Sequence, residues 1–177
     1  RVASVSASGY GWDVEATLAR LLKADLVRQS LTKPSRLCDV GCGNGLFLRV
    51  MAPRCGHVTG VDLNAAMLAE ARAMVERERI DNAELIQSSA SALPFADTSF
   101  DIVCCLSTLL LIPDIDGALS HMVRIVRTGG YLILDVAGLY NLSSIYWRLR
   151  YRRQGHFGVH AFSYPAIAKK LNALGCH

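Results

Sequence analysis

The chain has 177 residues, of which 51% are hydrophobic and 19% are charged, a balance that suits one globular domain and excludes an intrinsically disordered protein. Its longest nearly apolar run, residues 102–112, is too short to cross a bilayer, which excludes a transmembrane helix there. The net charge of +4 arises in residues 136–177, which hold six basic and no acidic side chains, whereas residues 1–135 hold 13 basic and 15 acidic ones.

The six cysteines favour neither a metal site nor a redox pair, because no two of them form a CxxC motif. Three of them, Cys38, Cys104 and Cys105, fall in apolar runs that we expect to be buried strands. A buried free thiol behaves as a small apolar side chain and is typical of reducing compartments. The cysteines therefore indicate a cytoplasmic protein without a bound metal.

Helical and strand patterns alternate from the start of the chain. Residues 13–30 place apolar side chains at helical spacing after Asp13, a suitable N-cap, and predict an amphipathic helix. Short apolar runs and helical patterns then predict three strands, at 36–40, 57–63 and 83–88, and two intervening helices, at 45–53 and 64–79.

The same alternation continues in the second half of the chain. The sequence predicts a strand at 100–106, a helix at 114–127, a Gly129-Gly130 turn and a strand at 131–136. A final helix at 163–174 has Ser163 as its expected N-cap and Gly175 just after its end.

Repeated strand–helix units predict a doubly wound, Rossmann-like α/β fold with a mainly parallel sheet. No internal repeat or linker divides the sequence, so we expect residues 1–177 to form a single domain. A sheet of this type usually continues with another strand after such a helix, but only Cys176 and His177 follow Gly175. We therefore expect a truncated chain that lacks the last strands of its sheet.

Three glycines alternate after the first predicted strand, in DVGCGNG (39–45). A glycine loop between a strand and a helix offers bare backbone and a helix N-terminus to a ligand. A nicotinamide dinucleotide is one candidate, because an acid, Asp62, ends the second strand. That fingerprint needs a glycine where this chain has Leu46, and Asp39 would repel a pyrophosphate. A cationic ligand that carries a ribose fits the loop better.

The loop resembles the first motif of class I S-adenosylmethionine-dependent methyltransferases, an acid followed by three alternating glycines. Three further stretches resemble this family in the same order: VTGVDLNAAML (58–68), SASALPFADTSFDIV (89–103) and RIVRTGGYLIL (124–134). The LPF…SFD motif and the C-terminal stretch at 162–175 are similar to those of the small-molecule branch that includes ubiquinone and menaquinone methyltransferases. The resemblance implies S-adenosylmethionine as the cofactor and a sheet that in this family usually has seven strands.

The resemblance also implies how the cofactor is held. Asp39 would hold the ammonium of the methionine moiety, directly or through water, and Gly41 and Gly43 would let the cofactor pack against backbone. Asp62 would accept hydrogen bonds from both ribose hydroxyls, since a carboxylate with two acceptor oxygens suits a vicinal diol.

At the adenine end, Leu63 and Met67 would supply apolar contact. Ser89 stands where the family commonly has an aspartate that accepts a hydrogen bond from the adenine amino group, and a serine hydroxyl can also accept one. Ala90 would offer its backbone N–H to a ring nitrogen. The complete cofactor-binding set comprises Asp39, Gly41, Cys42, Gly43, Asp62, Leu63, Met67, Ser89, Ala90 and Cys105.

Three residues close to these motifs are expected to be structural. Gly45 would permit tight helix–strand packing, and Gly60 would lie in a strand where a larger side chain does not fit. Asp101 would cap or pair near the start of its strand.

The catalytic residue is unknown from the sequence. The stretch CLSTLLLIPD (105–114) lacks the Asn/Asp-Pro-Pro-aromatic motif of branches that methylate amino groups of nucleic acid or glutamine. Many small-molecule relatives have histidines where this chain has Leu110 and Leu111, which indicate an apolar pocket wall. A base could then come from Tyr10, His156 or His160.

Residues 136–162 lie where this family often builds its acceptor site. They interleave aromatic side chains with four arginines that would hold an anionic group: Arg148, Arg150, Arg152 and Arg153. The same segment would also suit peripheral contact with an anionic membrane. We therefore expect methyl transfer to a small-molecule acceptor that is amphiphilic or anionic, with RNA as the alternative acceptor.

Two further alternatives remain. One is a non-catalytic S-adenosylmethionine-binding or scaffold subunit, because fold alone does not secure activity. The other is a nicotinamide-dependent reductase, although no Tyr-x-x-x-Lys motif occurs. The sequence indicates neither the methylated atom, the acceptor's identity nor the oligomeric state.

Overall fold

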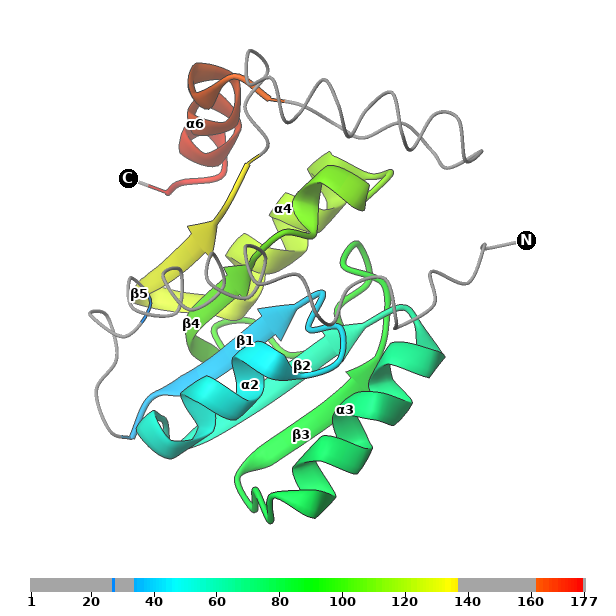
Figure 1. Ribbon diagram of the computed structural model, residues 1–177. Helices are drawn as coiled ribbons and strands as arrows, with labels where there is room; N and C mark the ends of the chain where they lie inside the picture. Colours follow the sequence, from blue (N-terminus) through cyan, green and yellow to red (C-terminus); the bar gives the residue numbers. More distant parts are fainter. Residues whose placement is uncertain (1–26, 28–33, 137–161, 177) are drawn as a thin grey trace, which may run out of the picture.

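The computed structural model describes Val27, residues 34–136 and residues 162–176. A sheet of five parallel strands in the order β3-β2-β1-β4-β5 forms its centre (Figure 1). The strands are β1 (Arg36–Val40), β2 (His57–Asp62), β3 (Ala83–Gln87), β4 (Phe100–Cys105) and β5 (Val126–Leu134). The α-helices are α2 (Leu46–Met51), α3 (Ala65–Arg77), α4 (Ile115–Ile125) and α6 (Tyr164–Ala173), and short 3₁₀ turns are η2 (Ala52–Arg54) and η3 (Leu109–Leu111).

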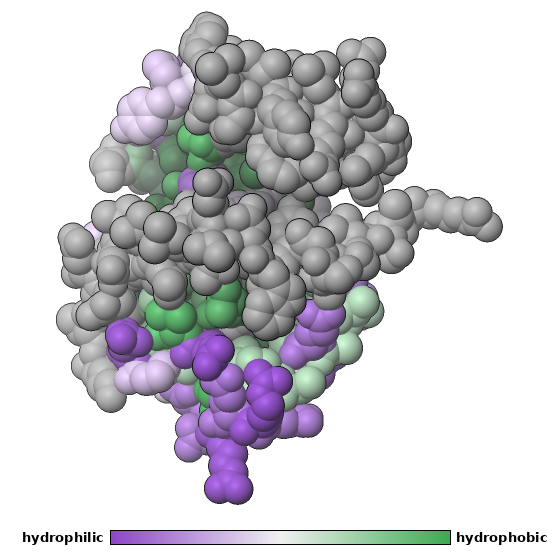
Figure 2. Space-filling model, viewed as in Figure 1, coloured by the Kyte–Doolittle hydropathy of each residue, from purple (hydrophilic) through white to green (hydrophobic). Residues whose placement is uncertain are grey.

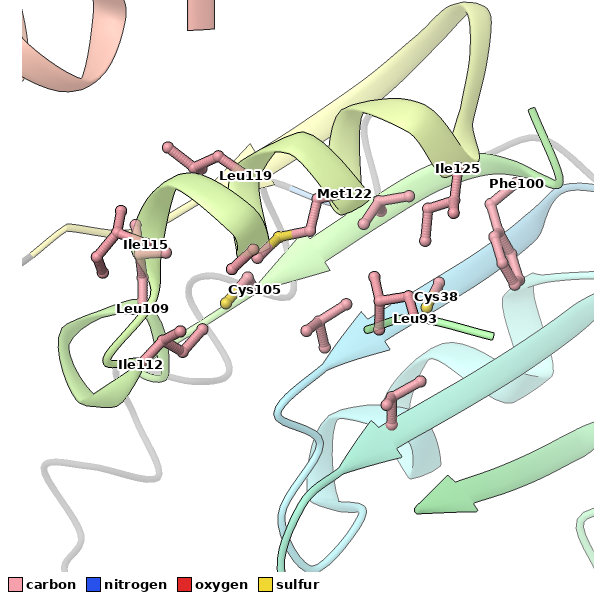
Figure 3. Close-up of a cluster of buried hydrophobic side chains, with 14 of the residues drawn as sticks. Cys38, Leu93, Phe100, Cys105, Leu109, Ile112, Ile115, Leu119, Met122 and Ile125 are labelled. Carbon is pink, nitrogen blue, oxygen red and sulfur yellow. The ribbon is translucent and has the colours of Figure 1, made fainter. Parts of the chain in front are cut away.

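The helices cover both faces of the sheet, so the predicted doubly wound α/β fold is confirmed. One apolar cluster joins α4 and Ile167 of α6 to one face of the sheet, and Figure 3 shows Met122 and Ile125 of α4 turned toward that face. The other cluster joins Phe47 and its neighbours in α2, with α3, to the opposite face. The five strands are fewer than the seven that the sequence led us to expect for a complete sheet of this family.

Alternation along the central strands explains how both faces are filled. In β4, Ile102 and Cys104 pack into the α2–α3 cluster, whereas Val103 and Cys105 pack into the α4–α6 cluster. All four side chains are at most 1% exposed. Strands that are buried on both faces read as continuous apolar runs, which is why the sequence identified them clearly.

Side-chain caps define where two of the helices begin. The Asn64 side chain accepts hydrogen bonds from the backbone N–H groups of Ala66 and Met67 at the start of α3. Asp114 accepts one from Gly117 at 2.9 Å at the start of α4. Both caps replace a missing intrahelical partner.

The polar outer face of α3 lies over the lower part of the molecule, where hydrophilic residues gather in Figure 2.

The predicted turn at Gly129-Gly130 is wrong, because both glycines lie inside β5. Helix α4 ends at Ile125 and the chain enters β5 directly. Between the pairs Phe100↔Val126 and Ile102↔Tyr131, β4 has one residue and β5 has four, residues 127–130. Gly129 adopts a φ of +75° there, and a Cβ on Gly130 would lie 2.5 Å from the Asp101 carbonyl oxygen. The glycines thus permit an irregularity within the strand rather than a turn before it.

The last helix ends as its sequence predicts. Gly175 has a φ of +88°, and the backbone N–H groups of Gly175 and Cys176 donate to Asn172 and Leu171. This pairing is a Schellman motif, which satisfies carbonyls that the helix leaves unpaired. The predicted helix at 13–30 lies outside the described residues except for Val27, which is fully buried in the α2–α3 cluster.

Five buried thiols make alkaline pH destabilising. Burial raises the pKa of each of them, that of Cys55 to about 11, and the set is Cys38, Cys42, Cys55, Cys104 and Cys105. The unfolded chain loses thiol protons above a pH of about 8.5 while the folded chain retains them, so stability falls as pH rises. We expect the free energy of unfolding to fall by about 1.4 kcal/mol per buried thiol for each pH unit above that point.

Urea unfolding at pH 7.5 and pH 9.5 under reducing conditions measures this effect. Cys104→Ala serves as the matched variant, because it removes one titrating thiol and its pH dependence should be shallower by one proton. Equal free energies of unfolding at the two pH values would contradict the expectation.

Candidate functional site

The cofactor-binding residues expected from the sequence lie at, or in the segments that follow, the carboxyl ends of the strands. Because all five strands run parallel, these ends meet at one edge of the sheet. Chain connections diverge there on either side of β1, with β2 as one neighbour and β4 as the other. Such a switch point is where open α/β sheets bind ligands.

The glycine loop after β1 is held against β2. The backbone N–H groups of Gly41 and Cys42 both donate to the Val61 carbonyl oxygen, at 2.7 and 3.0 Å. Gly41 and Gly43 adopt φ values of +82° and +55°, a region that glycine occupies without steric cost. The loop therefore exposes backbone in a conformation that other residues adopt only with strain.

A threonine from the segment after β4 closes over Gly41. A Cβ built on Gly41 would lie 2.2 Å from the Thr108 methyl carbon and 2.3 Å from its Oγ1. The same Thr108 hydroxyl donates to the Gly41 carbonyl oxygen at 3.2 Å. Glycine is therefore needed at position 41 for two reasons: the positive φ of the backbone and the lack of space for a Cβ beside Thr108.

Asp62 links the glycine loop to the start of α3. Its Oδ2 accepts from the Gly43 N–H and its Oδ1 from the Asn64 N–H, both at 2.8 Å. A carboxylate oxygen has a second lone pair, so each Asp62 oxygen retains capacity to accept a hydroxyl. The same side chain can therefore shape the loop and bind a vicinal diol.

Apolar side chains lie next to Asp62 in the chain and next to Gly43, its hydrogen-bond partner. Leu63 is 66% exposed, an unusual position for leucine. The Met67 methyl carbon lies beside Gly43, since a Cβ on this glycine would be in van der Waals contact with it at 3.4 Å. Two apolar side chains beside a diol acceptor fit a nucleoside.

Asp39 lies near the end of β1, just before the loop, and is only 3% exposed. After burial itself, Asp39 is the next cause of the raised pKa of Cys38, Cys42, Cys104 and Cys105. An ionised carboxylate at this depth would favour a cationic ligand and disfavour a phosphate.

Cys42 and Cys105 turn their side chains into the core. The Cys42 sulfur would lie 2.9 Å from a Cβ on Gly60, and Cys105 is fully buried in the α4–α6 cluster. Either residue could therefore contact a ligand only through its backbone atoms.

Ser89 and Ala90 follow β3 on a segment that is tied to β2, since the Ser88 N–H donates to the Asp62 carbonyl oxygen at 3.1 Å. The Ser89 hydroxyl lies 3.0 Å from the Ser91 hydroxyl and accepts from the Ser91 N–H at 3.3 Å. Ser89 is therefore oriented by its neighbour in a tight turn, which the Ala92 N–H closes on the Ser89 carbonyl oxygen.

Sequence reasoning missed Ser107, Thr108 and Asp135, which meet at the ends of β4 and β5. Asp135 accepts from the Ser107 N–H at 2.5 Å and from its hydroxyl at 3.4 Å. Ser107 has a φ of +58°, rare for a residue with a side chain. The rule that singled out Asp39 and Asp62, an acid at the end of a buried strand, also applies to Asp135.

Asp101, Gly60 and Gly45, which the sequence predicts to be structural, all make packing or pairing contacts within the fold. Asp101 accepts from the Arg36 N–H at 2.6 Å and pairs with Arg127 at 2.5 Å. A Cβ on Gly60 would lie 2.5 Å from a Leu48 methyl carbon. Gly45 permits close packing against α3 rather than against a strand, because its Cβ would lie 2.7 Å from the Met74 methyl carbon.

Several candidates for acceptor binding lie outside the described residues: Tyr10, Arg148, Arg150, Arg152, Arg153, His156 and His160. Leu110 and Leu111 belong to η3, where Leu111 is 42% exposed. Within the described part of the chain, no helix is both long and apolar enough to cross a membrane. The same residues contain no group of three or more His, Cys, Asp or Glu side chains arranged to hold a metal ion.

The chain is similar in sequence to known methyltransferases. The chain is 38% identical over 103 residues to a demethylmenaquinone methyltransferase of Listeria welshimeri, which covers 56% of this chain and 44% of that protein. It is 32% identical over 137 residues to a ubiquinone biosynthesis O-methyltransferase of Alkalilimnicola ehrlichii, covering 73% of this chain and 56% of that one. The chain thus spans about half the length of these relatives.

The fold has close counterparts among solved structures. The YcgJ protein of Bacillus subtilis superposes with a TM-score of 0.78 at 22% identity, covering 87% of this chain and 68% of that one. Residues 38–134 match the family described as methyltransferase domain, and this range includes the glycine loop, Asp62, Ser89 and Ala90. The chain therefore belongs to the methyltransferase-domain family of class I S-adenosylmethionine-dependent methyltransferases.

Proposed function

We propose that this chain transfers the methyl group of S-adenosylmethionine to a small-molecule acceptor. The observation that carries this function is Asp62, whose two oxygens orient Gly43 and Asn64 and retain lone pairs for a ribose diol. Demethylmenaquinone and ubiquinone methyltransferases among the relatives support a small acceptor.

The residues present fit the cofactor. Gly43 leaves loop backbone open, since a Cβ there would meet only the Met67 methyl carbon, at 3.4 Å, whereas Thr108 already fills the Cβ side of Gly41. Buried Asp39 supplies a carboxylate for the ammonium. In our assignment Leu63 and Met67 contact the adenine, while Ser89 accepts from its amino group and Ala90 donates to its ring. Cys42 and Cys105 take part through their backbones.

S-adenosylmethionine, when bound, supplies an electrophilic methyl group on a sulfonium whose departure leaves a neutral sulfide. The chain therefore needs alignment and exclusion of water more than an acid for the leaving group. The Asp62–Gly43 link and the Thr108–Gly41 contact provide alignment, because both fix the loop before any ligand arrives.

We further propose that the acceptor is amphiphilic or anionic and is held by the arginines of residues 136–162. That segment carries six aromatic and two histidine side chains, four arginines and no acid, which suits an apolar molecule with an anionic end. Replacement of Arg148, Arg150, Arg152 and Arg153 by serine should weaken acceptor affinity most at low salt. Equal affinities of variant and parent across a salt series would contradict an electrostatic role.

Transfer of a labelled methyl group tests the function. The 177-residue chain is incubated with methyl-tritiated S-adenosylmethionine and, separately, a naphthohydroquinone, a catechol, ethanolamine phosphate and total RNA. We expect label in a small-molecule product, and none with Asp62→Ala. Label in RNA alone would assign a nucleic-acid acceptor, while cofactor binding without transfer to any of these would favour a non-catalytic subunit.

A further inference from the structure

Arg124, near the end of α4, holds the segment that leads from β3 to β4. Its guanidinium donates to the carbonyl oxygens of Phe95 at 2.6 Å and Leu93 at 3.0 Å. It also pairs with the Asp97 carboxylate at 2.8 Å. The Arg124 carbonyl oxygen accepts from the Thr98 N–H at 2.9 Å, so one residue binds this segment at four points.

These contacts are charge-assisted and partly shielded from water. The Arg124 side chain is 32% exposed, and its hydrogen bonds to Phe95 and Leu93 lie in partly buried surroundings. Hydrogen bonds from a guanidinium are shorter and stronger than neutral ones, and a planar fork of donors fixes direction as well as distance. Lysine offers no such fork, so it cannot replace all of these contacts.

The segment held by Arg124 is continuous with Ser89 and Ala90. It begins where Ser88 is tied to Asp62, and Leu93, which is 3% exposed, anchors its middle in the α4–α6 cluster. Near its end, the Phe95 and Phe100 rings meet edge to face at 4.9 Å. Ser89 and Ala90 therefore lie on a short turn between two anchors, one at β2 and one at Arg124.

We propose that Arg124 is a positioning residue for the adenine end of the cofactor site. By holding the carbonyls of Leu93 and Phe95, it fixes where Ser89 and Ala90 stand and therefore how adenine is recognised. This inference rests on the proposed function, because it assumes that Ser89 and Ala90 contact adenine.

A purely structural residue and a positioning residue predict different results. Loss of a structural contact lowers the folded fraction, but it leaves the folded molecules with the same preference between ligands. Loss of a positioning contact changes that preference. The readout is therefore the ratio of affinities for S-adenosylhomocysteine and S-inosylhomocysteine, which differ at the adenine amino group.

Arg124→Met is compared with Arg127→Met, which removes a matched arginine that pairs with Asp101 near the start of β4, away from the site. We expect Arg124→Met to bind S-adenosylhomocysteine about tenfold more weakly and to show a smaller affinity ratio. Arg127→Met should change neither quantity, and thermal unfolding monitors the folded fraction of both.

Arg124→Lys and Asp97→Asn decide the question if Arg124→Met does not fold, since each removes only some of the contacts. An unchanged ratio in every folded variant overturns the role of Arg124 while leaving the proposed function intact. Absence of S-adenosylhomocysteine binding by the parent chain overturns both.

Discussion

Gly41→Ala is expected to abolish measurable binding of S-adenosylhomocysteine. The new Cβ would lie 2.2 to 2.6 Å from three atoms of Thr108, at a φ of +82°. Either Thr108 or the glycine loop must move, and the left-handed conformation adds a backbone penalty of about 1–2 kcal/mol. Because we propose that this loop holds the cofactor, its displacement should reduce affinity by more than about 100-fold.

Gly129→Ala separates the effect of the clash with Thr108 from the backbone penalty of a positive φ. Gly129 also has a positive φ, +75°, but a Cβ there meets nothing within 4 Å. This variant should therefore lose about 1 kcal/mol of stability with no change in ligand affinity. Calorimetry and urea unfolding of both variants measure the difference, and full-affinity binding by Gly41→Ala would show that the loop is not the site.

Asp62→Ala is expected to weaken S-adenosylhomocysteine binding by about 100-fold or more. The change removes the proposed acceptor of the ribose diol and also the bonds to Gly43 and Asn64. Hydrogen bonds to a charged group contribute about 1.5–3 kcal/mol each, so the loss of two accounts for this size.

Asp62→Asn and Asp116→Ala control for this result. Asparagine retains one oxygen that can accept from the Gly43 N–H, so its loss of affinity should be intermediate. Asp116 is an exposed acid on α4 that pairs with Lys170 of α6, and its replacement should leave binding unchanged. Equal affinities of Asp62→Ala and the parent chain would refute the assignment of the ribose.

The central strands of the sheet, β1, β2 and β4, were predictable because each of them is buried on both faces. Leu37 and Cys38, for example, are fully buried on opposite sides of β1, so both positions must be apolar. The site loop was predictable for a related reason. Alternating glycines between a strand and a helix have few structural explanations, and an acid at the end of the next strand adds a second constraint.

Contacts between distant segments were not predictable in this way. Thr108 and Gly41 are 67 residues apart, and no local pattern indicates that the one occupies the space beside the other. The four contacts of Arg124 depend likewise on how α4 packs beside the segment after β3. The irregular start of β5 was mistaken for a turn because a double glycine permits either conformation.

Calorimetric titration of the 177-residue chain with S-adenosylmethionine and S-adenosylhomocysteine, with NAD as the control ligand, tests the central claim most directly. The Asp62 and glycine-loop geometry predicts micromolar binding of both sulfur ligands, loss of that binding in Asp62→Ala, and no heat with NAD. Binding of NAD alone, or of none of the three ligands, would contradict it.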